Sequence, residues 1–188
     1  MNQAPSVFVF GGSFNPPHLA HVLAVSYVLA TNQHGRVLVI PTFQHPFGKS
    51  LAPYEHRVQM CELAMSDLSR VEVSRLEEEL GGESRTLRTV ERLAELHPGA
   101  RLRLVIGADI LSETPKWFGF DRIKELAPPL VLGRVGFENG PTAVIPGFSS
   151  TELRSALTEN RREDARVMLP DRVFDYMEEH RLYGTVPA

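Results

Sequence analysis

The sequence predicts an α/β fold with a doubly wound parallel sheet, followed by a helical C-terminal segment. Short apolar runs alternate along the chain with segments of helical periodicity, which is the order of elements in parallel sheets. Beyond Pro146 this alternation stops and only helical patterns follow. The chain has 188 residues, of which 43% are hydrophobic, enough for one domain with a full core. We therefore expect a single domain over residues 1–188, with a helical part over about 149–188.

Five apolar runs are expected to form the strands. The first, Val7–Phe10, ends at two glycines, and the second, Arg36–Ile40, is closed by a proline. The other three are expected at 71–73, 103–106 and 130–132. Ligands of such sheets bind beyond the carboxyl ends of the strands. The loops after the first, second and fourth strands should therefore lie together.

The segments between and after these runs show helical patterns. The first is apolar almost all round, which predicts that it is well buried. The third ends at His97-Pro98-Gly99, a combination that stops a helix for steric reasons. Residues 42–53 are rich in Pro, Gly and His and should form an exposed loop. The expected helices cover about 17–31, 54–68, 86–96, 151–159, 163–168 and 171–181.

Charge and composition exclude several classes of protein. The formal net charge is −3 and no long basic run is present, which argues against a nucleic-acid surface. No apolar run approaches the ~20 residues of a membrane helix, and the N-terminus lacks a signal-peptide pattern. We therefore expect a cytoplasmic protein, and the sequence is compatible with a homo-oligomer. The one cysteine, Cys61, allows no intrachain disulfide and is expected to be a buried apolar residue.

A phosphate site is expected in the loop after the first strand, GGSFNPPHLAH over 11–21. Gly11 and Gly12 let the backbone turn sharply and approach a ligand. His18 and His21 stand three apart, so they share one face at the start of the following helix. The unpaired N–H groups and the dipole of that helix also favour an anion. A zinc site is less favoured, because no cysteine or carboxylate stands at a supporting spacing.

The segment FSSTELR over 148–154 allows two interpretations. Ser149 and Glu152 form the pattern of a capping box at the start of a helix. The hydroxyls of Ser149, Ser150 and Thr151, with Arg154 one turn later, would also suit a triphosphate, because arginine binds phosphate oxygens in a fork.

A third group of candidates follows the fourth strand. Gly107 permits close approach of a ligand, and Asp109 could accept hydrogen bonds from a ribose. Trp117 is either a half-buried core residue or a flat platform for a heterocycle. The run Gly48-Lys49-Ser50 is no P-loop, because Phe43 stands where that motif requires glycine. Lys49 is still a candidate for reaching phosphates from its loop.

On these residues the chain resembles the nicotinate (nicotinamide) mononucleotide adenylyltransferases, which are nucleotidyltransferases with a His-x-x-His signature and a Rossmann-like sheet. The resemblance runs along nearly the whole chain. Residues 11–21 resemble the first loop of that family, 149–154 resemble its Ser-Ser-Thr-x-x-Arg motif, and 107–109 with Trp117 resemble the stretch that faces the nucleoside and the pyridine ring. Further similarity lies in a helix and in the C-terminal region, at Arg57, Met60, Val173, Tyr176, Leu182 and Tyr183.

The resemblance implies that the 5′-phosphate of a pyridine mononucleotide attacks the α-phosphorus of ATP, giving a dinucleotide and pyrophosphate. Mg²⁺ would be held chiefly by ATP oxygens and water, so that the chain itself supplies no metal site. The charge on the phosphates would be stabilised by His18, His21, Arg154 and Lys49. ATP would lie against Gly11, Gly12, Ser13, Phe14, His18, His21, Gly107, Asp109, Ser149, Ser150, Thr151 and Arg154. The mononucleotide would lie against Ser13, Phe14, Lys49, Ser84, Thr86 and Trp117, with its pyridine ring on the tryptophan.

Two positions depart from the family's pattern. Ala20 replaces the usual glycine between the histidines, and Arg85 stands where many relatives carry an aromatic residue. A positive side chain at position 85 favours the carboxylate of nicotinate over the amide of nicotinamide. The alternatives are a nucleotidyltransferase for another phosphorylated acceptor and a catalytically silent nucleotide sensor.

Overall fold

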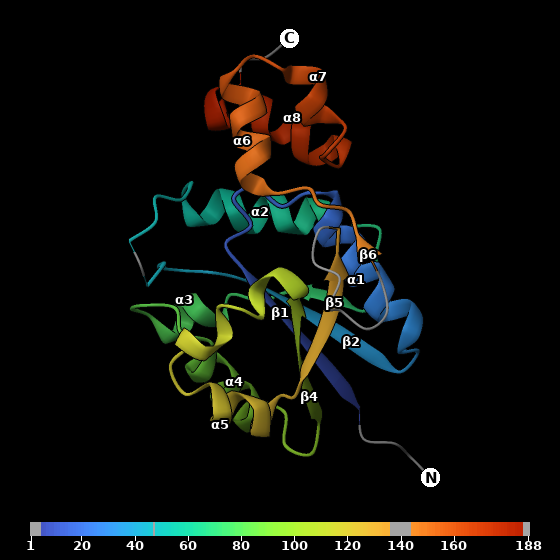
Figure 1. Ribbon diagram of the computed structural model, residues 1–188, viewed down its shortest axis with the longest axis vertical. Coiled ribbons are helices and arrows are strands. Elements are labelled where there is room, and N and C mark those ends of the chain that lie inside the picture. The colour runs from blue at the N-terminus through green and yellow to red at the C-terminus, as the bar shows by residue number, and fades with distance from the viewer. Residues whose placement is uncertain (1–4, 47, 136–143, 186–188) are drawn as a thin grey trace.

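The computed structural model describes residues 5–46, 48–135 and 144–185 (Figure 1). Its centre is a parallel sheet with the strand order β3-β2-β1-β4-β5-β6. The five predicted strands are confirmed, and a short sixth strand that the sequence analysis did not predict extends the edge beyond β5. The strands are β1 (Ser6–Gly12), β2 (Gly35–Pro41), β3 (Val71–Val73), β4 (Arg101–Gly107), β5 (Pro129–Arg134) and β6 (Val144–Ile145).

The chain winds outward from the centre of the sheet in two directions. Strand β1 pairs with β2 on one side and with β4 on the other, so that Ser6 lies opposite both Gly35 and Arg101. Strands β2 and β3 continue on the first side, and β5 and β6 on the second. The doubly wound topology that the sequence predicts is thereby confirmed. The strand order reverses between β1 and β4, where a crevice opens in sheets of this kind.

All six predicted helices are present, with ends shifted by a few residues. His18 has extended backbone (φ −140°, ψ 172°), so the first helix begins after it rather than at Pro17. Two short helices, α3 and α5, were not predicted. The helices are α1 (Leu19–Thr31), α2 (Tyr54–Met65), α3 (Leu76–Leu80), α4 (Thr86–Leu96), α5 (Phe120–Leu126), α6 (Ser150–Thr158), α7 (Arg162–Arg166) and α8 (Asp171–Glu179), with single 3₁₀ turns at η1 (Ala108–Ile110), η2 (Thr114–Lys116) and η3 (Leu182–Gly184).

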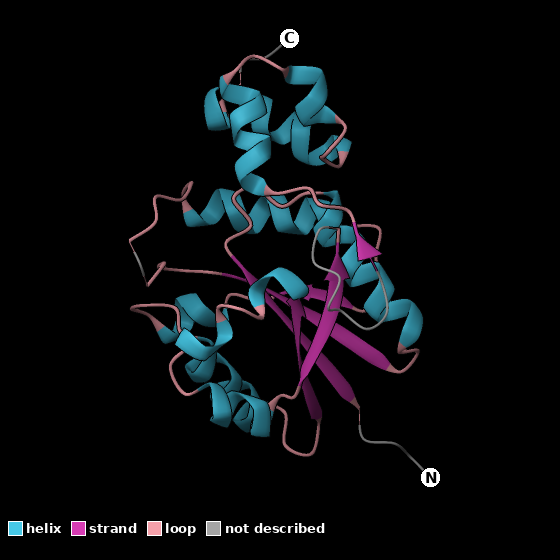
Figure 2. Cartoon of the chain, viewed as in Figure 1, coloured by secondary structure: helices cyan, strands magenta, loops and turns pink. Residues whose placement is uncertain are grey.

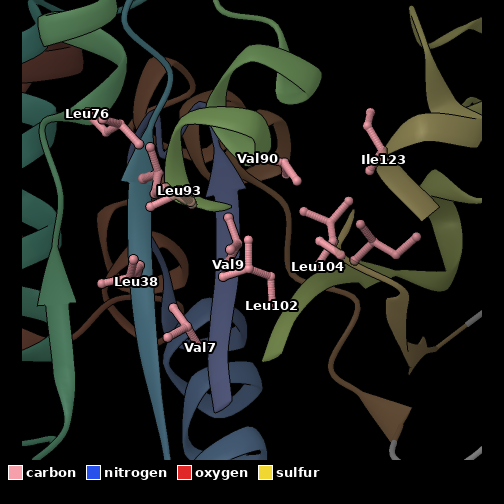
Figure 3. Close-up of a cluster of buried hydrophobic side chains, with 12 residues drawn as sticks. Val7, Val9, Leu38, Leu76, Val90, Leu93, Leu102, Leu104 and Ile123 are labelled. Carbon is pink, nitrogen blue, oxygen red and sulfur yellow. The ribbon is translucent and has the colours of Figure 1, made fainter. Parts of the chain in front are cut away.

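The two faces of the sheet carry separate apolar clusters because side chains alternate along each strand. On one face Phe8 packs with side chains of α1 and α2, Val25 and Cys61 among them. On the other, Val9 packs with side chains of α3, α4 and α5, including Leu93 (Figure 3). Helices thus cover both faces (Figure 2). Cys61 is fully buried, as predicted, and burial raises the pKa of its thiol.

Helix α2 joins the sheet to the C-terminal helices. Cys61 and Met65 point to the sheet cluster, whereas Met60 packs in a third cluster with Leu153 of α6 and Phe174 of α8. The C-terminal helices therefore stack on α2 at one end of the molecule (Figure 1). Among the described residues no helix has the length and apolar character needed to cross a membrane.

Candidate active site

A cavity of about 650 Å³ opens at the carboxyl ends of β1 and β4, where the strand order reverses. Its wall includes residues that follow β1, β2 and β4, so the prediction that these three loops meet is confirmed. The predicted site residues that line the cavity are Gly11, Gly12, Ser13, His18, His21, Lys49, Ser84, Thr86, Gly107, Asp109 and Trp117. Ala20 and Arg85, the two departures from the family's pattern, line it as well.

The two histidines form a stacked pair at the start of α1. The main-chain N–H of His18 donates a hydrogen bond to Nδ1 of His21 at 3.1 Å. Their ring centroids are 3.8 Å apart and the rings are inclined by 25°. Because Nδ1 of His21 accepts a hydrogen bond, its neutral ring carries the proton on Nε2. Nε2–H is thus the group that His21 can offer to a ligand.

Both imidazoles are neutral at pH 7. Burial, reinforced by the positive charge of Arg134, lowers the pKa of His18 to about 4. Burial also lowers the pKa of His21 well below its usual value, with smaller effects from His18 and Arg134. Nδ1 of His18 is buried and has no hydrogen-bond partner among the described residues. A buried polar atom without a partner is unfavourable, so a bound ligand or water that met it would be stabilised.

The motif over 149–154 lies beside the first loop rather than on the cavity wall. Ser149 is the N-cap of α6 and its hydroxyl accepts the N–H of Glu152 at 3.0 Å, which confirms the capping interpretation for that serine. Ser150 Oγ donates to the carbonyl of Pro16 at 2.9 Å, and Nη1 of Arg154 donates to the carbonyl of Asn15 at 2.6 Å. Nη2 of Arg154 also lies 3.3 Å from Thr151 Oγ1.

Phe14 is likewise placed behind the cavity surface. Only 2% of it is exposed, and its ring stands edge-on to that of His21 with centroids 4.9 Å apart. A Cβ at position 12 would press against the Phe14 ring at 3.2 Å, so Gly12 allows this packing. Phe14 therefore supports His21 from the side of the core.

Arg134, at the end of β5, was not predicted as a site residue. Its guanidinium forms an ion pair with Asp109, and each of the two side chains is less than a quarter exposed. Nη2 of Arg134 also donates to the carbonyl of Phe148 at 2.7 Å. A Cβ at position 107 would collide with Oδ1 of Asp109, so Gly107 makes room for this carboxylate. The available signal was a basic residue two positions after the strand predicted at 130–132.

The far end of the cavity is built from the residues before and within α4. Ser84 Oγ accepts the N–H groups of Phe43 and Gln44 at 2.9 and 3.2 Å, which ties this end to the loop after β2. Glu77, also not predicted, accepts from Thr89 Oγ1 at 3.1 Å and from Phe43 N–H at 3.2 Å. Burial raises the pKa of the Glu77 carboxyl.

Aromatic and charged side chains complete this end. Trp117 is half-buried and meets the ring of Phe120 edge-on, with centroids 6.0 Å apart. The side chain of Arg85 pairs with Glu83 at 2.9 Å, and its guanidinium lies 5.7 Å from the ring centroid of Phe118, which is 69% exposed. The wall of one cavity thus contains both a pair of neutral imidazoles and the aromatic side chain of Trp117.

The described part of the chain holds no group of three or more His, Cys, Asp or Glu side chains that could bind a metal ion. The carboxylate of Asp109, which lines the cavity, is already paired with the guanidinium of Arg134. A divalent cation at this site would therefore need oxygen ligands from a substrate or from water.

Comparison with known proteins places this geometry in a class. The family model described as cytidylyltransferase-like matches residues 9–156, which span β1 through most of α6. A doubly wound sheet with paired histidines at its switch point thus defines a nucleotidyltransferase of the cytidylyltransferase-like class.

The relatives narrow this class further. A probable nicotinate-nucleotide adenylyltransferase of Anaeromyxobacter dehalogenans is 48% identical over 97% of this chain and 99% of its own length. One from Thermus thermophilus is 36% identical over 93% and 97%. The chain belongs to the nicotinate-nucleotide adenylyltransferase family.

A solved structure shares the fold. A nicotinic acid mononucleotide adenylyltransferase of Plasmodium falciparum, complexed with NaAD, aligns with a TM-score of 0.83 at 22% identity, covering 96% of this chain and 97% of its own. At that identity the likeness supports the Rossmann-like sheet, as the sequence analysis predicts.

Proposed function

We propose that the protein transfers the adenylyl group of ATP to nicotinate mononucleotide, giving the dinucleotide and pyrophosphate. The observation that carries this proposal is that the stacked pair His18 and His21 lines the same cavity as Trp117. One continuous space of about 650 Å³ can take a triphosphate and a second nucleotide together. The whole chain acts as one nucleotidyltransferase domain, because the C-terminal helices bond to the first loop.

The reaction needs positioning and charge stabilisation rather than a covalent intermediate on the protein. An oxygen of the mononucleotide phosphate attacks the α-phosphorus of ATP, and the bond to the oxygen that bridges to the β-phosphorus breaks. Pyrophosphate leaves with that electron pair. His21 donates Nε2–H toward the phosphate oxygens, and His18 contributes its ring beside it. Lys49 reaches the phosphates from the loop after β2.

Arg134 joins the residues proposed to stabilise the phosphates because of its position. Its charge lies close enough to lower the pKa of both histidines, so it also acts on phosphates that contact them. Arg154 acts partly through the protein, because its guanidinium holds the carbonyl of Asn15. ATP is used as its magnesium complex, with the metal on phosphate oxygens and water.

The pyridine ring of the mononucleotide stacks on Trp117, in a pocket lined by Ser84 and Thr86. The carboxylate of nicotinate suits this end because the first N–H groups of α4 are unpaired within the helix and Arg85 adds positive charge. A cytoplasmic location, predicted from the sequence, belongs to the same proposal.

Pyrophosphate release by the purified protein, with ATP and magnesium, tests this function. Nicotinate mononucleotide, nicotinamide mononucleotide and phosphopantetheine are offered separately, and the product is identified by chromatography. We expect fast release and a dinucleotide product with nicotinate mononucleotide. Release with phosphopantetheine alone would instead assign another acceptor, and ATP binding without turnover would indicate a nucleotide sensor.

A further inference from the structure

In the described part of the chain, the C-terminal segment makes four hydrogen bonds to residues 15–19, the stretch that contains His18 and precedes His21. Two of them come from Ser150 and Arg154, described above. The third is from the N–H of Leu19 to the carbonyl of Met168 at 2.8 Å. The fourth joins the hydroxyl of Tyr183 to Oδ1 of Asn15 at 2.8 Å. The position of the first loop is therefore set in part by helices that follow the sheet in the sequence.

Asn15 is the point at which these contacts converge. It is only 3% exposed, and its Oδ1 accepts a second hydrogen bond, from the N–H of Ala52 at 2.9 Å. The carbonyl of Ala52 accepts from Nε of Arg57 at 2.9 Å, while Nη1 of Arg57 donates to the carbonyl of Ser13 at 3.0 Å. Arg57 is 1% exposed. A closed network thus joins the first loop to the segment that carries Lys49.

We propose that Tyr183 is a positioning residue. Through its hydrogen bond to Asn15 it fixes the position of the His18–His21 pair relative to the loop that carries Lys49. This inference rests on the proposed function, since both loops are assigned to the phosphates there. Among the described residues no hydrogen bond or ring contact joins Tyr183 to either histidine, and Tyr183 is not part of the cavity wall. In the part of the chain that the structure describes, its hydroxyl is the one side-chain group of η3 that forms a hydrogen bond to the first loop.

The backbone conformation of Tyr183 supports its assignment as a positioning residue. Its φ of 54° and ψ of 26° lie in the left-handed region, which is unfavourable for a residue with a bulky side chain. Such conformations persist where the surrounding structure fixes them, and they gather at functional sites. Burial raises the pKa of the Tyr183 hydroxyl above its ordinary value, so the group remains a donor across the pH range of any assay.

The substitution Tyr183→Phe tests the proposal because it removes the hydroxyl and keeps the ring. Asn15 retains Ala52 as a partner, so the loss leaves no buried acceptor unpaired. Tyr176→Phe is the matched control: its hydroxyl shares a 2.8 Å hydrogen bond with His56, in the same C-terminal region but away from the first loop. Each variant loses one hydrogen bond of similar length.

Two readouts are compared in the two variants. For Tyr183→Phe we expect kcat to fall on the order of tenfold with little change in KM, because the residue acts on the geometry of the transition state and touches no substrate. Backbone amides in a peptide over 11–23 should exchange with deuterium faster than in wild type. Tyr176→Phe should match wild type in both, with a melting temperature similar to that of Tyr183→Phe.

Wild-type kcat and wild-type exchange in Tyr183→Phe would overturn the proposal, as would an equal loss of kcat in Tyr176→Phe. The exchange readout needs no enzymatic turnover. If wild-type protein showed no adenylyl transfer, the proposed function would fail. Faster exchange confined to Tyr183→Phe would still support the proposal that Tyr183 fixes the first loop through Asn15.

Discussion

The main-chain N–H of His18 bonds to the ring of His21, while the two rings stack 3.8 Å apart. The two imidazoles are therefore one unit: neither ring can turn without breaking a hydrogen bond or a stack made with the other. Since both are neutral, in the proposed function they would act on phosphate as hydrogen-bond donors rather than as cations.

Replacement of His21 by alanine should remove most of the activity. The variant loses the Nε2–H donor and the acceptor that orients the His18 backbone, and loss of one such donor typically lowers kcat by about 10²–10³-fold. The measurement is pyrophosphate release at saturating substrates, with circular dichroism to verify folding. His34→Ala, at an exposed site between α1 and β2, is the control. Near-normal kcat in folded His21→Ala would contradict the role of this residue.

Stability should depend on pH through His18. Its pKa falls from 6.5 in the unfolded chain to about 4 in the folded protein, so the unfolded state binds more protons between these values. Stability is therefore full above pH 6.5 and declines as pH falls toward 4, by roughly 3 kcal/mol for this group. The lowered pKa of His21 acts in the same direction.

Melting temperatures measured from pH 4 to 7 check this dependence. His18→Gln cannot take up the proton, so its melting temperature should fall less over that interval than that of wild type. His34→Gln, exposed and away from the cavity, should keep the wild-type slope. Parallel curves for wild type and His18→Gln would show that His18 does not titrate as described.

Removal of the charge of Arg134 should raise the pKa of both histidines. Arg134→Gln deletes the cation that adds to the effect of burial at each ring. A pH titration of the His18 ring by NMR should give a higher midpoint than in wild type. Arg92→Gln, which breaks an exposed pair with Glu95 on α4, should leave the midpoint unchanged. The same midpoint in both variants would remove Arg134 from the electrostatics of the site.

The charge at position 85 should influence the choice between the two pyridine mononucleotides. For Arg85→Gln we expect the ratio of kcat/KM for nicotinate mononucleotide to that for nicotinamide mononucleotide to fall by a factor of about 5, a modest effect because the side chain is exposed. Glu83→Gln releases the guanidinium from its partner and should raise the ratio. Equal ratios in all three proteins would assign the choice to the backbone of α4 alone.

The architecture was largely predictable because each element carries a strong local signal. The apolar runs at β1, β2 and β4 are bounded by glycine or proline, and α4 ends at Leu96 as predicted because His97-Pro98-Gly99 follows it. The meeting of the loops followed from a rule about parallel sheets rather than from any one residue. Helices α3 and α5 were not predicted: five and seven residues hold few turns, and each lies in a segment that also contains strands, whereas α7, equally short, lies in a region with helical patterns only.

The site was predictable to the extent that it depends on local sequence. The glycine turn and the histidine pair are contiguous in the chain, and the structure places them together. Arg134 belongs to no motif, and its part in the site comes from a pairing with Asp109 that only the folded sheet creates. The hydroxyls of 149–151 were ambiguous for another reason: their spacing is compatible with a helix cap, the favoured interpretation, and also with a phosphate site. The contacts in the folded structure were needed to show that Ser149 caps α6.

The pairing of β1 with β4 also bears on the order of folding. Ser6 lies opposite Arg101, so the strands that flank the cavity are separated by about half of the 188 residues. Contacts so distant in sequence form late, because closing a long loop is entropically unfavourable. During synthesis, β1 emerges with its histidine loop while the opposite wall of the cavity does not yet exist. A nascent chain that ends before β4 contains both histidines but has no binding cavity. Substrate affinity should therefore develop only when synthesis is more than half complete.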